Sequence, residues 1–238
     1  MMGIEGRVAV ITGGEGPLGR AVTGKFLSQG VKIFIGWNNP EEWEEAKKNI
    51  PSEFEGQVAN MQVDLTQEDE AEKLMEKAKM EFGSIDILLH MVGMVFAGKT
   101  IWETDMAMME KLLNVNLKSA FICAKHAIRI MLQKGKGRVV FFPPSLLLQP
   151  KQRFGAYAVS KSGLVTLTEG LREELKDTQI TVNAVMFSVL DTPKTRKMPN
   201  PEPEKWVKPL EVADLLSALC SDDFRLLSGS TLKLFGKL

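Results

Sequence analysis

Residues 6–38 constrain the fold more than any other stretch of the chain. An apolar run at 7–12 ends in a glycine cluster and leads into a segment with apolar residues at Val22, Phe26 and Leu27. This pattern predicts a strand, a tight turn and a helix, and residues 31–36 predict a second strand. Two parallel strands joined by a helix form a βαβ unit, whose turn presents N–H groups at a helix N-terminus to a pyrophosphate. The stretch therefore predicts a nucleotide site.

The glycine turn itself has the spacing of a dinucleotide-binding motif. Gly14, Gly16 and Gly19 fit G-x-G-x-x-G, and the strand before and helix after them supply the context that makes the motif meaningful. The alternative is a glycine-rich turn that binds no ligand. Pro17 has no N–H to offer, but proline is tolerated in a first helical turn.

The rest of the chain alternates predicted strands and helices. Further strands are expected at 57–65, 85–92, 138–142, 179–186 and 230–235, and helices at 40–48, 68–82, 104–134 (one helix or two), 154–176 and around 212–219. Five of the eleven prolines fall in 193–209, a loop expected to cover a ligand. We predict an α/β fold: a single-domain, Rossmann-type, doubly wound parallel sheet of about seven strands with helices on both faces, spanning 1–238.

Composition narrows the function classes. Lys plus Arg and Asp plus Glu are both 30 and form no basic stripe, which argues against a nucleic-acid surface and favours a small-molecule substrate. Cys123 and Cys220 are too few for a disulfide framework, and with His90 and His126 they form no metal pattern. We expect no signal peptide, no membrane span and a cytoplasmic setting.

Tyr157 and Lys161 are the residues that most clearly indicate a catalytic function. A spacing of four on a helix places the phenol and the ammonium on one face, where the cation should lower the pKa of the phenol and make it a usable general acid or base. Tyr157 is the only tyrosine. The alternative is ordinary packing beside a solvated charge.

The order of these features resembles the short-chain dehydrogenase/reductase family over essentially the whole chain. The matching features are the glycine turn, Asp64 after a strand, Asn116 in a helix, and Tyr157 with Lys161. The resemblance implies an NAD(P)-dependent oxidoreductase that moves hydride between nicotinamide and a carbonyl (ketone or 3-oxoacyl) or imine carbon. It implies that Tyr157 donates the proton, that Lys161 lowers its pKa and holds the nicotinamide ribose, and that Asn116 carries a relay water. It also implies a homotetramer or homodimer.

The resemblance implies a set of cofactor-binding residues as well. Asp64 would hold adenine, although it could also cap a local turn, and Thr192 would meet the carboxamide. His90 replaces a family asparagine and is expected to be a packed residue. The implied cofactor-binding residues are Gly13, Gly14, Gly16, Leu18, Gly19, Trp37, Asn38, Asp64, Leu65, Gly93, Tyr157, Lys161, Leu190 and Thr192.

One catalytic position departs from the family pattern. Pro144 stands where the family has a serine that polarises the substrate carbonyl, and Ser145 follows it. Proline donates no hydrogen bond. Either Ser145 takes the role, or the substrate is activated without it, or the chain is a nucleotide-binding pseudoenzyme with a regulatory or structural role. A local resemblance of residues 13–19 and 190–210 to dihydropteridine reductase and related bacterial reductases fits the second alternative.

The choice of cofactor depends on the tip of the second strand. Trp37, Asn38 and Asn39 supply no acid to hold the ribose 2′-OH of NAD and no arginine to bind a 2′-phosphate, whereas Glu15 would repel a phosphate. Trp37 could stack on adenine or pack against the protein. The sequence slightly favours NADP(H) over NAD(H).

Overall fold

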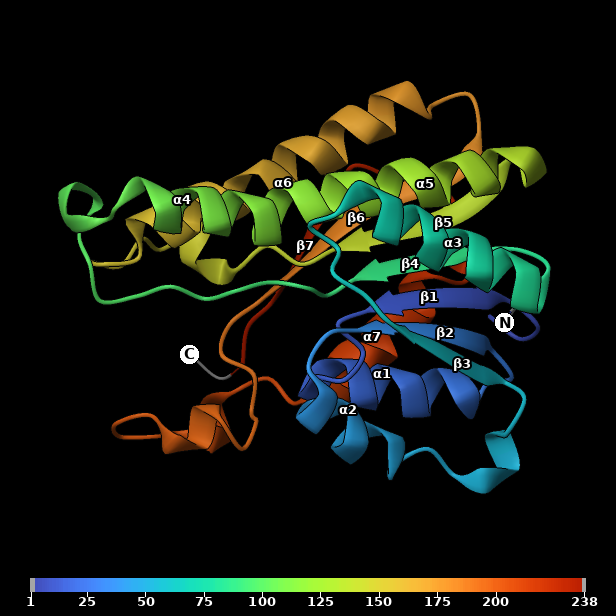
Figure 1. Cartoon of the computed structure of the whole chain (residues 1–238), viewed down its shortest axis with the longest axis horizontal. Coiled ribbons are helices and arrows are strands. Elements are labelled where there is room, and N and C mark those ends of the chain that lie inside the picture. Colours follow the sequence, from blue (N-terminus) through green and yellow to red (C-terminus); the bar gives the residue numbers. More distant parts are fainter. Residues whose placement is uncertain (1–2, 237–238) are drawn as a thin grey trace.

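The computed structural model describes residues 3–236 and contains a seven-stranded parallel sheet (Figure 1). The strand order is β3-β2-β1-β4-β5-β6-β7, so the order reverses between β1 and β4. This confirms the predicted doubly wound α/β fold. The strands are β1 (Val8–Thr12), β2 (Lys32–Trp37), β3 (Val58–Gln62), β4 (Ile87–His90), β5 (Lys136–Phe141), β6 (Gln179–Phe187) and β7 (Thr231–Leu234).

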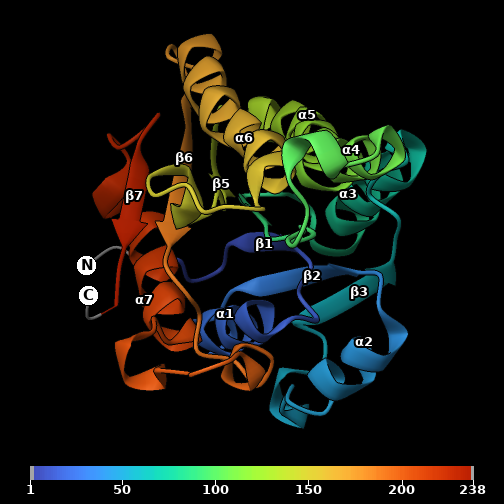
Figure 2. The same ribbon diagram turned by 90° about the vertical axis from the view of Figure 1, so that its left-hand side faces the viewer.

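Helices cover both faces of the sheet. In Figures 1 and 2, α3, α4, α5 and α6 lie on one side, and α1, α2 and α7 lie on the other. The sequence explains several helix ends: the Asn39 side chain accepts from the N–H groups that begin α2, and Gly83 ends α3 with φ 84°. The helices are α1 (Pro17–Leu27), α2 (Pro40–Lys47), α3 (Glu68–Phe82), α4 (Met106–Leu113), α5 (Ser119–Lys134), α6 (Gly155–Glu174) and α7 (Pro209–Leu219).

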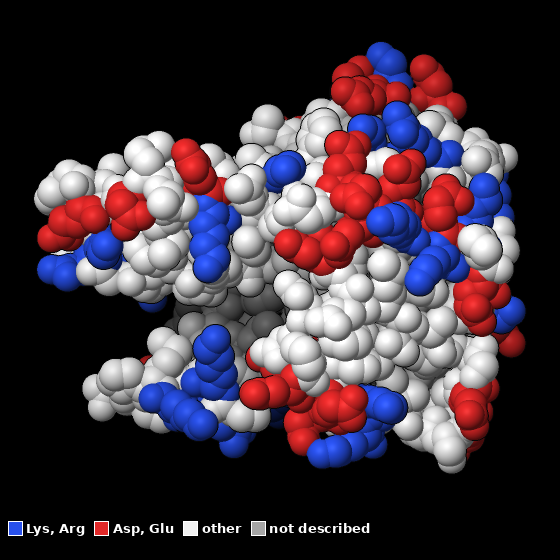
Figure 3. Space-filling view, in the orientation of Figure 1, with Lys and Arg blue, Asp and Glu red and all other residues white. Residues whose placement is uncertain are grey.

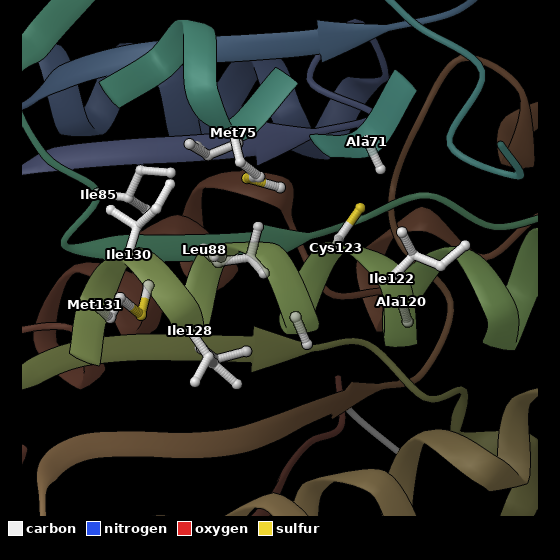
Figure 4. Close-up of a cluster of buried hydrophobic side chains, with 14 of the residues drawn as sticks. Ala71, Met75, Ile85, Leu88, Ala120, Ile122, Cys123, Ile128, Ile130 and Met131 are labelled. Atoms are coloured by element: carbon white, nitrogen blue, oxygen red, sulfur yellow. The ribbon is translucent and has the colours of Figure 1, made fainter. Parts of the chain in front are cut away.

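Two apolar clusters hold the layers together. On the first side, Met75 of α3 and Cys123 and Met131 of α5 pack toward Leu88 of β4 (Figure 4). On the second side, α1 and α7 pack on the other face of the same strands. Strand β1 is buried at all of its residues, as expected of a strand covered on both faces. Each large apolar side chain that is buried stabilises the fold by about 1.5–3 kcal/mol. The two clusters therefore hold the strands in place, including their carboxyl ends.

The segment 104–134, predicted to form one helix or two, contains two α-helices. Between α4 and α5, Asn114–Lys118 form a π-helical turn in which the N–H of Ser119 donates to the carbonyl of Asn114. Such turns insert one extra residue into a helix and often lie at functional sites. Asn116 is buried inside this turn.

The proline-rich loop forms a lobe at the carboxyl-terminal edge of the sheet. It contains short 3-10 turns at Thr195–Lys197 and Pro203–Lys205, and a hollow separates it from the segment that carries α4 (Figures 1 and 3). In open α/β sheets the ligand site lies at this edge, where the strand order reverses. Other 3-10 turns are Ser52–Phe54, Ile101–Glu103, Ser145–Leu147 and Asp222–Phe224.

Candidate active site

The glycine turn leaves donors available at the start of α1. Gly16 is the N-cap and offers no side-chain acceptor, and Pro17 is the first helical residue. Within residues 3–236, the N–H groups of Leu18 and Gly19 have no hydrogen-bond partner. A Cβ at Gly19 would collide with the backbone of Gly14, so the turn and helix can be this close only with glycine there. The turn therefore fits a pyrophosphate, which needs N–H donors at a positive helix end.

Two pockets meet at this turn. One, of about 280 Å³, reaches the end of β2, and the other, of about 630 Å³, reaches α6. Both are lined by Gly13, Gly16, Met91 and Gly93. They form two sections of one site at the carboxyl ends of β1 and β4, which suits the two halves of a dinucleotide.

The smaller pocket is lined by the predicted residues Trp37, Asn38, Asp64 and Leu65. The Trp37 ring stacks on Trp43 with centroids 5.4 Å apart, and its Nε1 donates to Asn60 Oδ1 at 2.9 Å. These contacts favour the packing interpretation of Trp37.

Asp64 has a local role in the same pocket. Its Oδ1 accepts from the N–H of Thr66 at 3.0 Å and from the Thr66 hydroxyl at 2.8 Å. The carboxylate therefore closes a turn after β3 and lines the pocket as well.

The larger pocket brings together Ser145, Tyr157 and Lys161. Tyr157 and Lys161 lie one turn apart in α6, and Ser145 begins a 3-10 turn directly after the extended Pro144. The Lys161 ammonium donates to the carbonyl of Val92 at 3.2 Å.

Gly93 makes the position of this ammonium possible. A Cβ at Gly93 would lie 2.6 Å from Lys161 Nζ, so no larger residue fits there without moving the ammonium. Gly93, which the sequence predicts to bind the cofactor, therefore also leaves the space that the Lys161 ammonium occupies.

Burial dominates the titration of this pair. It raises the pKa of Tyr157 to about 12 and lowers the pKa of Lys161 to about 8. The prediction of a lowered pKa for the phenol is wrong: its net pKa is raised, because desolvation of the phenolate is the dominant effect. Tyr157 consequently keeps its proton at neutral pH, which suits a proton donor.

Asn116 lies behind the pockets and lines neither of them. Its Oδ1 accepts from the N–H of Met94 at 2.7 Å, and its Nδ2 donates to the Met94 carbonyl at 2.9 Å and to Ser160 Oγ at 2.8 Å. Ser160 Oγ in turn donates to the Tyr157 carbonyl at 2.8 Å. The side chain thus ties the segment after β4 to α6. The sequence reasoning missed Ser160, although its place directly before Lys161 was a signal.

His90 is a packed residue, as expected. It is 1% exposed, and its Nδ1 lies 2.9 Å from the Thr12 hydroxyl and its Nε2 3.1 Å from the Ser119 hydroxyl. Because the Ser119 hydroxyl donates to the Val115 carbonyl, Nε2 carries the ring proton and Nδ1 accepts from Thr12. Burial first, and then the charge of Lys161, lower the pKa of His90 to about 3, so the ring is neutral.

The remaining predicted residues are divided between the pocket and its supports. Leu190 and Thr192 line the larger pocket, and the Thr195 hydroxyl holds them by donating to the Leu190 carbonyl at 2.6 Å and lying 2.9 Å from Thr192 Oγ1. Thr195 was not anticipated. Gly14 lines neither pocket, because it packs against Ile35, whose Cγ2 a Cβ would approach to 2.6 Å.

Residues 3–236 contain neither a candidate metal site nor a candidate membrane span. No group of three or more His, Cys, Asp and Glu side chains there is arranged to hold a metal ion. None of the helices in this part of the chain combines the length and the apolar character needed to cross a membrane.

The chain is similar to many known proteins. The family model described as short chain dehydrogenase matches residues 7–203. A 3-oxoacyl-acyl-carrier-protein reductase of Thermotoga maritima is 27% identical, with 100% of this chain and 99% of the relative covered.

Solved structures share the fold. Levodione reductase superposes with a TM-score of 0.89 at 23% identity, covering 98% of this chain and 97% of that one. ElxO, solved with NADP bound, superposes with a TM-score of 0.88 at 23% identity, covering 95% and 96%.

Proposed function

Since the chain belongs to the short-chain dehydrogenase family, we propose that it is an NAD(P)-dependent oxidoreductase that transfers hydride between nicotinamide and a carbonyl or imine carbon. One observation carries this proposal. Ser145, Tyr157 and Lys161 line a single pocket that also includes the glycine turn. Folding alone does not require a proton donor, a cation and a hydroxyl to meet beside a nucleotide site.

The residues of the site suit distinct parts of the dinucleotide. The N–H groups of Leu18 and Gly19 would hold the pyrophosphate, and Asp64 would hold the adenine end. Lys161 and Thr192 would hold the nicotinamide half. When bound, the nicotinamide supplies or accepts the hydride.

The chain's own groups handle the proton. At neutral pH the buried Tyr157 is protonated and can donate to the oxygen of a carbonyl under reduction. The Lys161 ammonium, held by the Val92 carbonyl, stabilises the negative charge that develops on Tyr157 when its proton leaves. Ser145 would donate a hydrogen bond that polarises the carbonyl.

The lining of the larger pocket indicates a substrate class. Its walls include the apolar side chains of Phe142, Leu146, Phe154 and Phe187, which would contact an apolar part of the substrate. We infer a substrate with an apolar body and one reducible carbonyl, a ketone or a 3-oxoacyl group. The latter is the group named in the Thermotoga relative.

Two alternative functions make different demands on the site. A dihydropteridine-reductase-like enzyme would not need Ser145, and a pseudoenzyme would need neither Tyr157 nor Lys161. The presence of both residues in the pocket favours an active enzyme.

We also propose that the chain works as one domain in the cytoplasm and assembles as a homotetramer or homodimer. Phe121 and Leu132 of α5 and Val159 of α6 are apolar side chains exposed by 56%, 48% and 52%. A second copy packed on these helices would cover them.

The test is a comparison of wild type with Tyr157→Phe. Titrations with NADH and NADPH, followed by a screen of ketones and 3-oxoacyl thioesters, should first reveal nucleotide binding and turnover. Tyr157→Phe should abolish turnover while changing nucleotide affinity little, because the ring stays and only the proton donor is lost. Undiminished turnover in this variant would place the chemistry elsewhere.

A further inference from the structure

Glu15, in the glycine turn, places a carboxylate at the tip of β2. Its side chain is 8% exposed, and Oε1 accepts from the N–H of Asn38 at 3.0 Å and from the N–H of Asn39 at 3.4 Å. These two residues directly follow the last residue of β2, Trp37. The acid that a dinucleotide fold uses to hold a ribose 2′-OH belongs at this tip, where the strand's own sequence supplies none.

The Glu15 carboxylate has unused acceptor capacity. Within residues 3–236, Oε2 is shielded from solvent, has no hydrogen-bond partner, and takes part in no ion pair. A buried carboxylate oxygen without a donor is costly. A hydroxyl brought to this carboxylate by a ligand would supply the donor that the protein lacks.

The surroundings oppose a second phosphate. The smaller pocket is lined by three carboxylates, Glu15, Glu42 and Asp64, and by no lysine or arginine from the part of the chain that the structure describes. A phosphate at the tip of β2 would need N–H donors or cations. The two N–H groups there already donate to Glu15, and no cation from residues 3–236 lines this pocket to balance the repulsion.

We infer that Glu15 is the residue that selects the cofactor: it accepts from the ribose 2′-OH of NAD(H) and excludes the 2′-phosphate of NADP(H). The inference rests on the proposed function, since it presumes a dinucleotide site. It reverses the slight preference for NADP(H) drawn from the strand tip. That preference rested on the missing acid at the strand tip and treated Glu15 only as a repulsive charge in the glycine turn, whereas the fold brings the Glu15 carboxylate to the tip itself.

The experiment measures binding without catalysis. Dissociation constants for NADH and NADPH are determined by calorimetry at low salt, with 5′-AMP and 2′,5′-ADP as a second pair that lacks nicotinamide. Wild type should bind NADPH about 100-fold more weakly than NADH, as expected for a dianion beside a fixed carboxylate. The 2′,5′-ADP and 5′-AMP pair should differ in the same direction.

The variant Glu15→Gln keeps an oxygen for the Asn38 and Asn39 N–H groups and removes the charge. It should lower the ratio of the NADPH to the NADH constant by at least about tenfold, mainly by tightening NADPH. Glu42→Gln is the matched control, because Glu42 lines the same pocket but is exposed and does not bind the strand tip. It should change the ratio less than about threefold, since its charge is screened by solvent.

Each outcome decides something. If neither dinucleotide binds wild type, the proposed function fails and this inference falls with it. If wild type binds NADPH as tightly as NADH, the inference alone is refuted. If Glu15→Gln weakens both nucleotides equally, Glu15 only supports the strand tip and the inference is also refuted. If Glu15→Gln does not fold, Glu15→Ser replaces it in the same comparison. The ratio of the 2′,5′-ADP to the 5′-AMP dissociation constant of wild type then tests the inference without any variant.

Discussion

Acid should destabilise this protein partly through His90, and the substitution His90→Asn should expose that contribution. The ring is buried, its Nδ1 accepts from Thr12, and its Nε2 donates to Ser119. Protonation would put a charge where no water reaches and would turn the Nδ1 acceptor into a donor facing a hydroxyl. Asparagine at this position has no titrating group, so the variant lacks this part of the pH dependence.

The magnitude follows from the pKa values. His90 has a pKa of about 3 in the folded chain against 6.5 for an ordinary histidine, so the unfolded chain binds the extra proton between these values. The lowered folded pKa means that stability is full above pH 6.5 and is lost as the pH falls toward 3. By linkage, about 2 kcal/mol is lost at pH 5, and about 5 kcal/mol at most.

The assay is urea unfolding followed by tryptophan fluorescence at pH 8, 7, 6 and 5 and at one protein concentration. His90→Asn should be less stable than wild type at pH 8, and the difference should shrink by about 2 kcal/mol at pH 5. His126→Asn is the control for the general cost of replacing an imidazole, because His126 is buried but lies beside the carboxylates of Glu68 and Glu72 rather than beside hydroxyls. Its difference from wild type at pH 8 measures that cost. Parallel pH profiles for wild type and His90→Asn would refute the reasoning.

Two further predictions concern the catalytic hydroxyl and the assembly. Ser145→Ala should lower kcat on a simple ketone by about 10² to 10³, as loss of one donor to a developing oxyanion does, whereas an unchanged kcat would remove Ser145 from the site. Pro144→Ser, measured in the same assay, tests the pseudoenzyme alternative. Only that alternative predicts that wild type is inactive and that Pro144→Ser has turnover. Light scattering at micromolar protein should give the mass of a tetramer or dimer, and a monomer would contradict the assembly proposal.

The fold was predictable because its signals are local and repeated. The apolar run of β1, the glycine turn and the stripe of α3 each indicate one element, and alternating strands and helices allow few topologies. The sequence left open whether 104–134 forms one helix or two, and the π turn at Asn114–Lys118 was not predictable, since such a turn leaves the apolar pattern of the helix nearly unchanged.

The site was predictable only in part, because a sequence does not display distances across the fold. Tyr157 and Lys161 are four residues apart on one helix, so their spacing alone predicted that their side chains lie on the same face. Glu15 reaches the β2 tip from a different segment, and Ser160 meets Asn116 across 44 positions. The pKa of Tyr157 was mispredicted because it depends on burial, which only the folded chain reveals.

The π turn at Asn114–Lys118 has a consequence for the permitted length of the chain. Deleting one residue there would leave an ordinary α-helix and rotate α4 by about 100° relative to α5. The deletion would turn the buried face of α4 away from α6 while α5 stayed packed on α3. An insertion or deletion in this turn would therefore change which face of α4 packs on α6 beside Tyr157, whereas a substitution would leave that face in place.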